Sequence, residues 1–372
     1  MKIVLLALLL AGGALAQRHK VNINTETPEG QALQQIGQET DDAKKLAECE
    51  KFTQDYPKSD NLAWVYAEMQ PLYVKANQPD KAIDAGEKIM ALDPEDMDTA
   101  LATLKAAEAK KDPDLVKKWS NTTAALAQKV IASPQPKDED AVEDWKKHVD
   151  YAKQVNTYSE YAIDAAALQT TDPRKRVDLI EALYDRNPQS QYMAQLLPAA
   201  LQALQQMNDA DRKTAFAEKV LAKDPNNDEM LILAADGYSQ KGKEPDKVIE
   251  YSSKLAEVLK QKAKPEGVNE ADWTKRNNVI ICLAHYWPGK AYYSQKKYGP
   301  AKKELTEALS LADANPALKP ELLFMLGDSE YRLENIVEAL KYFQQCAALK
   351  SNLQAQAAKN VAAIKSQYRA VK

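Results

Sequence analysis

The closest approach to a catalytic or nucleotide-binding motif in this chain is Gly237-Tyr-Ser-Gln-Lys-Gly242-Lys243. Its glycine and lysine spacing is that of a phosphate-binding loop, which also needs a Ser or Thr to hold magnesium. Glu244 stands in that place, and its carboxylate would repel phosphate. A helical pattern, not a strand, precedes the segment, and no Gly-x-Gly pair occurs after residue 16. We therefore interpret it as a turn between helices and predict no cofactor-binding residue.

Residues that could ligate a metal are few and far apart. The three histidines are His19, His148 and His285, with neither a paired histidine spacing nor a Cys-x-x-Cys. Residues 224–228 begin like a calcium loop, but Glu229 replaces its glycine and Ala235 its bidentate glutamate. We predict no metal site, and we interpret 224–228 as a turn followed by a helix start.

Cysteine usage gives no disulfide framework. Cys49, Cys282 and Cys346 are odd in number and widely separated, unlike the dense cysteines of a small disulfide-stapled domain. We predict buried thiols, with a Cys282–Cys346 bridge left open. No grouping of Ser, His, Asp or Glu predicts a catalytic residue, so we predict that the chain is not an enzyme. Hydrolase activity is left as a minor alternative, to be tested with generic esterase, peptidase and glycosidase substrates.

The amino-acid composition indicates the fold class and the kinds of partner that the chain could have. Among 372 residues only 11 are glycine, 28% are charged and 45% are hydrophobic, a mixture that favours helices over a glycine-rich sheet or barrel. The net charge of −4 provides no basic field for nucleic acid or anionic lipid. A mean hydropathy of −0.55 excludes a protein with many membrane spans. We predict an all-α chain with neither nucleic acid nor a membrane as its partner.

A helix-turn-helix pattern repeats along the chain. Each copy has apolar or small residues at steps of three and four, a polar break, and a second such ladder. Small residues fall where neighbouring helices would have to approach closely. The clearest copies are Tyr66, Met69, Tyr73, Ala82, Gly86 and Ile89; Leu231, Ala234, Tyr238, Val248 and Leu255; Gly289, Tyr292, Ala301 and Leu305; and Leu323, Leu326, Gly327, Ala339 and Phe343.

Prolines punctuate the repeat. Pro57, Pro94, Pro134, Pro188, Pro225 and Pro265 follow helical stretches, at successive intervals of 37, 40, 54, 37 and 40 residues. With its ladders and this period, the chain resembles the tetratricopeptide repeat (TPR) family, in its exported bacterial type. The resemblance implies an all-α superhelix, a solenoid of antiparallel helix pairs, over residues 29–350.

The middle of the chain, about 135–190, departs from the family's pattern. Residues 139–170 predict one long helix or two abutting ones, with a stripe that includes Val149, Val155, Tyr158, Tyr161 and Ala165. The interval from Pro134 to Pro188 fits neither one repeat nor two. We also expect lengthened helices around 269–295.

The two ends have their own signals. Residues 1–16 predict a signal peptide, because Lys2 precedes an apolar run and Ala14-Leu-Ala16 is a small-x-small cleavage site. An N-terminal membrane anchor is the alternative. Gln17 follows the cut, so no cysteine is present for lipid attachment, and we expect a periplasmic or secreted protein. Residues 17–28 predict a flexible segment, and 351–372 a capping helix with an apolar stripe.

In proteins of this resemblance the first helices of successive pairs line a concave channel that binds peptides or partner helices. The resemblance therefore implies a non-enzymatic exported scaffold that binds a protein or peptide and either assists cell-envelope assembly or holds a multi-protein complex together. A glycan- or small-ligand-binding protein on the same frame is the alternative. By position on the first helices, the partner-binding candidates are Trp64, Lys75, Asp236, Gln240, Lys290, Tyr293, Asp328, Tyr331 and Arg332.

Overall fold

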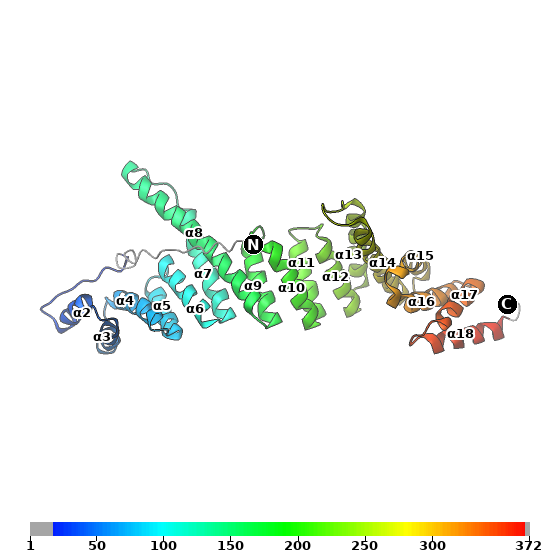
Figure 1. Ribbon diagram of the computed structural model, residues 1–372, viewed down its shortest axis with the longest axis horizontal. Coiled ribbons are helices and arrows are strands. Elements are labelled where there is room, and N and C mark those ends of the chain that lie inside the picture. Colours follow the sequence, from blue (N-terminus) through cyan, green and yellow to red (C-terminus); the bar gives the residue numbers. More distant parts are fainter. Residues whose placement is uncertain (1–17, 369–372) are drawn as a thin grey trace. The chain divides into compact units, whose positions relative to one another are not determined.

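The computed structural model describes residues 18–368 and is all-α over that range, with no strand (Figure 1). The chain divides into two compact units, residues 1–207 and 208–372. The predicted signal peptide, residues 1–16, lies outside the described residues, as do residues 369–372. In both units each helix packs against its neighbours in sequence, as the predicted succession of antiparallel helix pairs requires. The predicted all-α fold of stacked helix pairs is confirmed.

Over residues 18–207, unit 1 is built from four hairpins and one further helix. Within each hairpin the two helices are joined by a short turn. The helices are α2 (Pro28–Gln38), α3 (Asp42–Asp55), α4 (Leu62–Lys75), α5 (Pro79–Leu92), α6 (Met97–Lys110), α7 (Pro113–Ile131), α8 (Glu139–Gln169), α9 (Pro173–Arg186) and α10 (Met193–Met207).

Unit 2 begins with one helix, continues with three hairpins and ends with a single helix. Two short 3₁₀ turns, η1 (Ala312–Ala314) and η2 (Pro316–Leu318), connect its second and third hairpins. The α-helices are α11 (Ala210–Leu221), α12 (Asp228–Lys241), α13 (Pro245–Gln261), α14 (Glu270–Ser294), α15 (Tyr298–Ser310), α16 (Lys319–Arg332), α17 (Ile336–Ala348) and α18 (Gln354–Gln367).

Local sequence explains where the helices begin and end. Proline occupies the first turn of α2, α5, α7, α9 and α13, where its missing N–H costs no hydrogen bond. The six punctuating prolines each lie two to four residues beyond the end of a helix. Five hairpin turns contain one residue in the left-handed region, and these are Asn77, Lys111, Gly242, Lys296 and Glu334. Gly242 ends α12, so the turn predicted for the Gly237–Lys243 segment is confined to its end: residues 237–241 are the last residues of α12, and the turn to α13 begins at Gly242.

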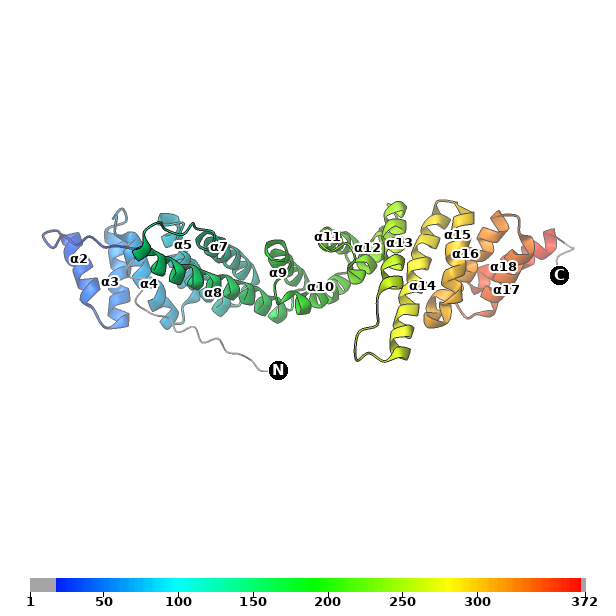
Figure 2. The ribbon, with the colours of Figure 1, turned by 90° about the horizontal axis from the view of Figure 1, so that it is seen from above.

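The irregular middle is one hairpin with a lengthened first helix. Helix α8 is continuous over 31 residues, and α9 completes the interval between Pro134 and Pro188. The first turns of α8 project beyond the neighbouring helices of unit 1 (Figure 1). Helix α14, with 25 residues, is the lengthened helix expected near 269–295, and its first turns extend past α15 (Figure 2).

The last helix covers the end of unit 2. Helix α18 places the stripe of Leu353, Ala357, Val361, Ile364 and Tyr368 against the apolar cluster around Phe343. Ala357 and Ile364 are buried there, while most of the remaining α18 residues face solvent. This is the packing that a capping helix requires.

The three cysteines are buried and unpaired, as predicted. The thiols of Cys282 and Cys346 each donate to a backbone carbonyl, of Ala308 and Pro320 respectively, at 3.4 Å. The open alternative of a Cys282–Cys346 bridge is therefore not realised in this structure. Burial, with a smaller contribution from Glu68, raises the pKa of the Cys49 thiol to about 12.

We expect the folded protein to be inert toward thiol reagents. A chromogenic aromatic disulfide at pH 8 should react with no thiol of the folded protein. After denaturant is added, three thiols per chain should react. Only the thiolate attacks, and burial both removes access and disfavours that charged form. Immediate reaction of one thiol in the native protein would contradict this expectation.

Candidate functional site

The first helices of successive hairpins contact one another within each unit. In unit 1, α4 contacts α6, α6 contacts α8, and α8 contacts α10; in unit 2, α12 contacts α14, and α14 contacts α16. We call each row a first-helix face. Because the helices in a row are neighbours in space, side chains far apart in sequence are brought onto one continuous surface.

A hollow in unit 1 lies beside this row, and we call it the α8 hollow. It has a volume of about 560 Å³ and is lined by residues of α6, α7, α8 and α9 and of the two hairpin turns. The α8 contribution is mostly alanine, at positions 162, 165 and 166. Small side chains leave the space open, and Tyr161 stands at its edge.

Tyr161 is the side chain that the α8 hollow offers most plainly to a partner. It is 47% exposed, and so is Leu168 two turns further along α8. Its ring lies between those of Tyr158 and Tyr192, with centroids 6.0 and 6.4 Å away. Neighbouring rings limit the movement of Tyr161, so a partner would meet an aromatic surface that is already ordered.

The rim of the α8 hollow is polar, and several of its side chains are paired. Tyr158 donates to the carboxylate of Glu108 over 2.8 Å, yet burial raises the pKa of Glu108 above its usual value. Lys175 pairs with Asp114 at 3.2 Å. Asp172 caps α9 by accepting from the backbone of Arg174 and Lys175. An apolar centre with a polar rim is the usual anatomy of a protein-binding patch.

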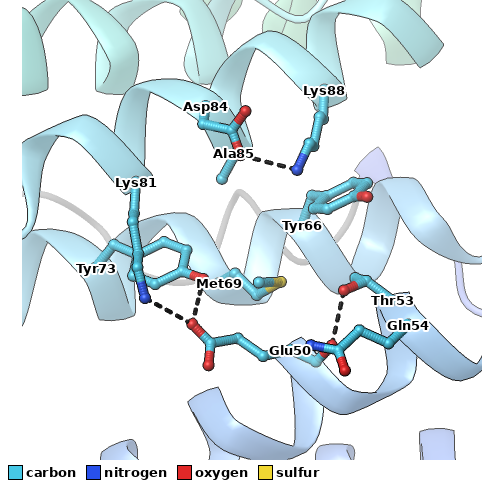
Figure 3. A pocket seen from close by; sticks show the side chains of 10 residues that line it. All are labelled: Glu50, Thr53, Gln54, Tyr66, Met69, Tyr73, Lys81, Asp84, Ala85 and Lys88. Atoms are coloured by element: carbon cyan, nitrogen blue, oxygen red, sulfur yellow. Dashed lines mark hydrogen bonds and ion pairs between the residues drawn. The ribbon is translucent and has the colours of Figure 1, made fainter.

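A second cavity in unit 1, the α3–α5 cavity, is smaller and more polar (Figure 3). It measures about 320 Å³ and lies between α3, α4 and α5. Glu50 accepts from the Tyr73 hydroxyl (2.8 Å) and from Lys81 (3.0 Å), which together hold the pKa of Glu50 below its usual value. Asp84 pairs with Lys88 at 2.8 Å. The charges lining this cavity are thus paired with one another.

Its two tyrosines are not open platforms for a sugar. The Lys88 ammonium lies 5.2 Å from the centre of the Tyr66 ring, and that of Lys81 lies 5.2 Å from the centre of the Tyr73 ring. Tyr73 itself is 5% exposed. A stacking ligand would have to displace both amines, so the α3–α5 cavity is the weaker candidate.

The predicted partner-binding residues of unit 1 do not act together. The sequence placed Trp64 facing away from the core, but it is 8% exposed and packs in the main apolar cluster of unit 1. Apolar residues occupy most sides of α4, so the helix is buried around much of its circumference. Lys75 is exposed and pairs with Asp42 of α3 at 3.0 Å.

Two predicted residues on α12 lie together in unit 2. Gln240 donates to Asp236 over 2.8 Å, and Lys213 of α11 reaches both side chains at 3.4 Å. Lys213 is itself buried. These polar groups satisfy one another, so this part of the face presents a closed network.

Three of the predicted residues on α14 and α16, Tyr293, Asp328 and Arg332, form a second connected group. The Tyr293 hydroxyl donates to Asp328 over 2.8 Å, and burial followed by this bond raises the pKa of Tyr293. Arg332 lies 3.6 Å from the same carboxylate, and Lys290 pairs with Glu321 at 3.1 Å. Tyr331 points elsewhere, with its hydroxyl 3.4 Å from Gln367 of α18.

Sequence reasoning missed the exposed residues of the α8 hollow. It placed Tyr161 in the buried stripe of residues 139–170, whereas Val149, Val155 and Ile163 carry that role. A second ladder of Tyr158, Tyr161, Ala165 and Leu168, at steps of three and four, was the available signal. Two ladders on one helix indicate that it contacts neighbours on two sides.

The structure also brings together three side chains that the sequence analysis did not group as possible metal ligands. His19, Asp93 and Asp96 lie close enough that one ligand atom from each falls within 4.8 Å of the others. Asp93 and Asp96 share the turn between α5 and α6, and the segment before α2 carries His19 to them. Spacing along the sequence does not reveal this contact.

No helix among residues 18–368 is both long enough and apolar enough to cross a bilayer.

Comparisons with known proteins give loose structural likenesses. No family model matches the chain, and no curated protein matches it. The crystal structure of the P58(IPK) TPR domain is similar over 92% of this chain and 99% of its own, with 12% identity and a TM-score of 0.27. The human IFIT1 dimer with m7Gppp-AAAA is similar over 94% of this chain and 88% of its own, with 10% identity and a TM-score of 0.31.

Scores this low carry no inference about a partner. The fold follows instead from the hairpins themselves, with their left-handed turn residues, terminal prolines and rows of first helices. Within each of its two units, this chain is an all-α protein of stacked, TPR-like helix pairs.

Proposed function

We propose that this chain is a non-enzymatic scaffold that binds a protein or peptide, and that the α8 hollow is its principal contact. The observation that carries the proposal is the half-exposed pair of Tyr161 and Leu168 beside a hollow with a polar rim. Tyrosine is one of the residue types enriched among the few side chains that supply most of the binding free energy at protein interfaces, and Leu168 adds apolar area beside it. A row of first helices presents them on a surface that needs little ordering on binding.

The choice of a protein over a glycan rests on the two cavities. The tyrosine faces of the α3–α5 cavity are covered by lysines, whereas the α8 hollow has an accessible ring and an apolar floor. An apolar side chain of a partner would bury against Tyr161 and the alanines of α8.

We further propose that the protein is exported and acts in assembly of the cell envelope. The support is the sequence of residues 1–16, with Lys2, an apolar run and the Ala14-Leu-Ala16 cleavage site. N-terminal sequencing of protein recovered from its host should begin at Gln17. Recovery of the chain with residues 1–16 intact in the cytoplasmic fraction would overturn this part.

The binding proposal is tested by capture from host cells followed by binding measurements with the recovered partner. Tyr161→Ala should weaken affinity about tenfold or more, as loss of an interface hot spot does. Leu92→Ala is the matched control, because Leu92 is also in unit 1 and is 55% exposed but lies on α5, outside the α8 hollow. Equal affinity of both variants would remove the α8 hollow as the site, and recovery of a sugar instead of a polypeptide would favour the glycan alternative.

A further inference from the structure

The segment before α2 is tied to unit 1 at an acidic corner. Arg18 donates to both oxygens of Asp93, with Nε at 2.6 Å and Nη2 at 2.9 Å. The His19 imidazole lies with Nε2 2.8 Å from Oδ2 of Asp96. Further along, the backbone N–H of Asn22 donates to the side chain of Asn61. Thus residues 18–22 run across the ends of hairpins that are distant in sequence.

The groups at this corner have the composition of a metal site. One imidazole nitrogen and one oxygen from each of Asp93 and Asp96 lie within 4.8 Å of one another. Nitrogen of His and oxygen of carboxylates are ordinary ligands for Zn²⁺, and three protein ligands leave the fourth position for water. His19 is 8% exposed and Asp96 is 1% exposed, so two of the three ligands are held in place by packing.

Asp96 is fixed by hydrogen bonds that leave its outer oxygen directed at His19. Oδ1 accepts from the backbone N–H groups of Asp98 and Thr99, capping α6, while the Thr99 hydroxyl donates to Oδ2 over 2.6 Å. Hydrogen-bonded carboxylates of this kind are typical of metal ligands, because the outer bonds hold the ligand's orientation.

The charge of the corner is incompletely balanced. Asp93, Asp96 and Asp98 all lie near Arg18. Asp98 has the neutral Tyr151 hydroxyl as a hydrogen-bond donor at 2.7 Å. One guanidinium, that of Arg18, faces these three carboxylates. A divalent cation would add positive charge beside Asp96, whose carboxylate is almost completely buried.

We propose that His19, Asp93 and Asp96 form a binding site for Zn²⁺, which the ion enters by displacing the Arg18 guanidinium from Asp93. The exchange breaks the two hydrogen bonds of Arg18 and releases that side chain to solvent. Arg18 is 41% exposed and can leave without disturbing the core. The site is independent of the α8 hollow, so a test of zinc binding does not bear on the proposed function.

Zinc titration of the purified chain, with any affinity tag removed, tests the proposal by calorimetry. One Zn²⁺ per chain should bind, and the thermal unfolding midpoint should rise as zinc is added. His19→Gln and Asp93→Asn should each weaken binding about tenfold or more. Arg18→Gln should instead tighten binding, because Asp93 then has no competing cation.

The matched control is His285→Gln. His285 also lies 2.8 Å from a carboxylate, that of Glu304, but it is not part of a three-ligand group in the described residues. Binding should survive this change. A metal could also bind to His19 together with the amino group at a chain terminus. Binding at such a site would not depend on Asp93, so the Asp93→Asn variant distinguishes the two sites. No zinc binding by the unaltered chain, or no tightening in Arg18→Gln, would overturn the proposal.

Discussion

Replacing Gly86 with alanine is expected to destabilise unit 1 by about 2 to 4 kcal/mol. A Cβ at this position in α5 would collide with the Thr103 hydroxyl and lie 2.5 Å from Nε2 of Gln70. These two side chains are buried and bonded to each other at 2.8 Å, and Gln70 also donates to the carbonyl of Ala82. Relief of the collision therefore breaks buried hydrogen bonds between α4, α5 and α6.

The control is Gly37→Ala in α2, where an added Cβ meets no atom within 4 Å. Alanine is the better helix former, so this change should be neutral or stabilising by up to about 1 kcal/mol. Denaturant unfolding followed by circular dichroism measures both variants, and hydrogen exchange in α5 and α6 assigns the effect to unit 1. A Gly86→Ala protein as stable as the Gly37→Ala protein would show that the Gln70–Thr103 bond is not needed.

The repeat could be predicted because the sequence of each hairpin contains the residues that begin, end and pack its own helices. Close approach needs a small residue at fixed places, and Ala82, Ala301 and Ala339 are fully buried there. Prolines mark helix ends because they cannot continue a helix. The long interval before Pro188 left the middle unsettled, since only tertiary packing decides whether 31 residues form one helix or two.

The candidate site was harder to predict because exposure depends on how many neighbours a helix has. Trp64 and Tyr161 both lie on first helices, yet Trp64 is 8% and Tyr161 is 47% exposed. The two apolar ladders on α8 do not indicate which side of the helix is exposed to solvent. The α8 hollow exists because alanines on α8 leave space beside α6, α7 and α9, which is a property of four helices together.

Contacts of the segment before α2 lay beyond sequence reasoning for a different reason. Residues 17–28 have no periodicity, so a flexible segment was predicted. Arg18 and His19 nevertheless meet Asp93 and Asp96, more than 70 positions away. Such a contact is set by charge and by the path of the chain, and neither leaves a periodic pattern.

Phe343→Ala is expected to cost unit 2 about 3 to 5 kcal/mol. Phe343 is 2% exposed and lies at the centre of the apolar cluster formed by α16, α17 and α18. Its ring meets Phe324 edge to face, with centroids 5.5 Å apart, and lies directly over Gly327. Truncation would leave a cavity beneath the capping helix. Val337→Ala, also on α17 but at a side chain that is 65% exposed, should change stability by no more than about 0.5 kcal/mol.

The coupling of Phe343 with Gly327 makes the mechanism testable beyond the loss of stability. A Cβ on Gly327 would lie 2.8 to 3.0 Å from atoms of the Phe343 ring, so Gly327→Ala alone should destabilise unit 2. In the Phe343→Ala background the same change has no ring to strike, and alanine's better helix propensity should make it neutral or stabilising. A double-mutant cycle by denaturant unfolding measures this change of sign. Additive effects of the two substitutions would contradict direct packing of the ring on the glycine, and the close approach of α16 and α17 would then need another cause.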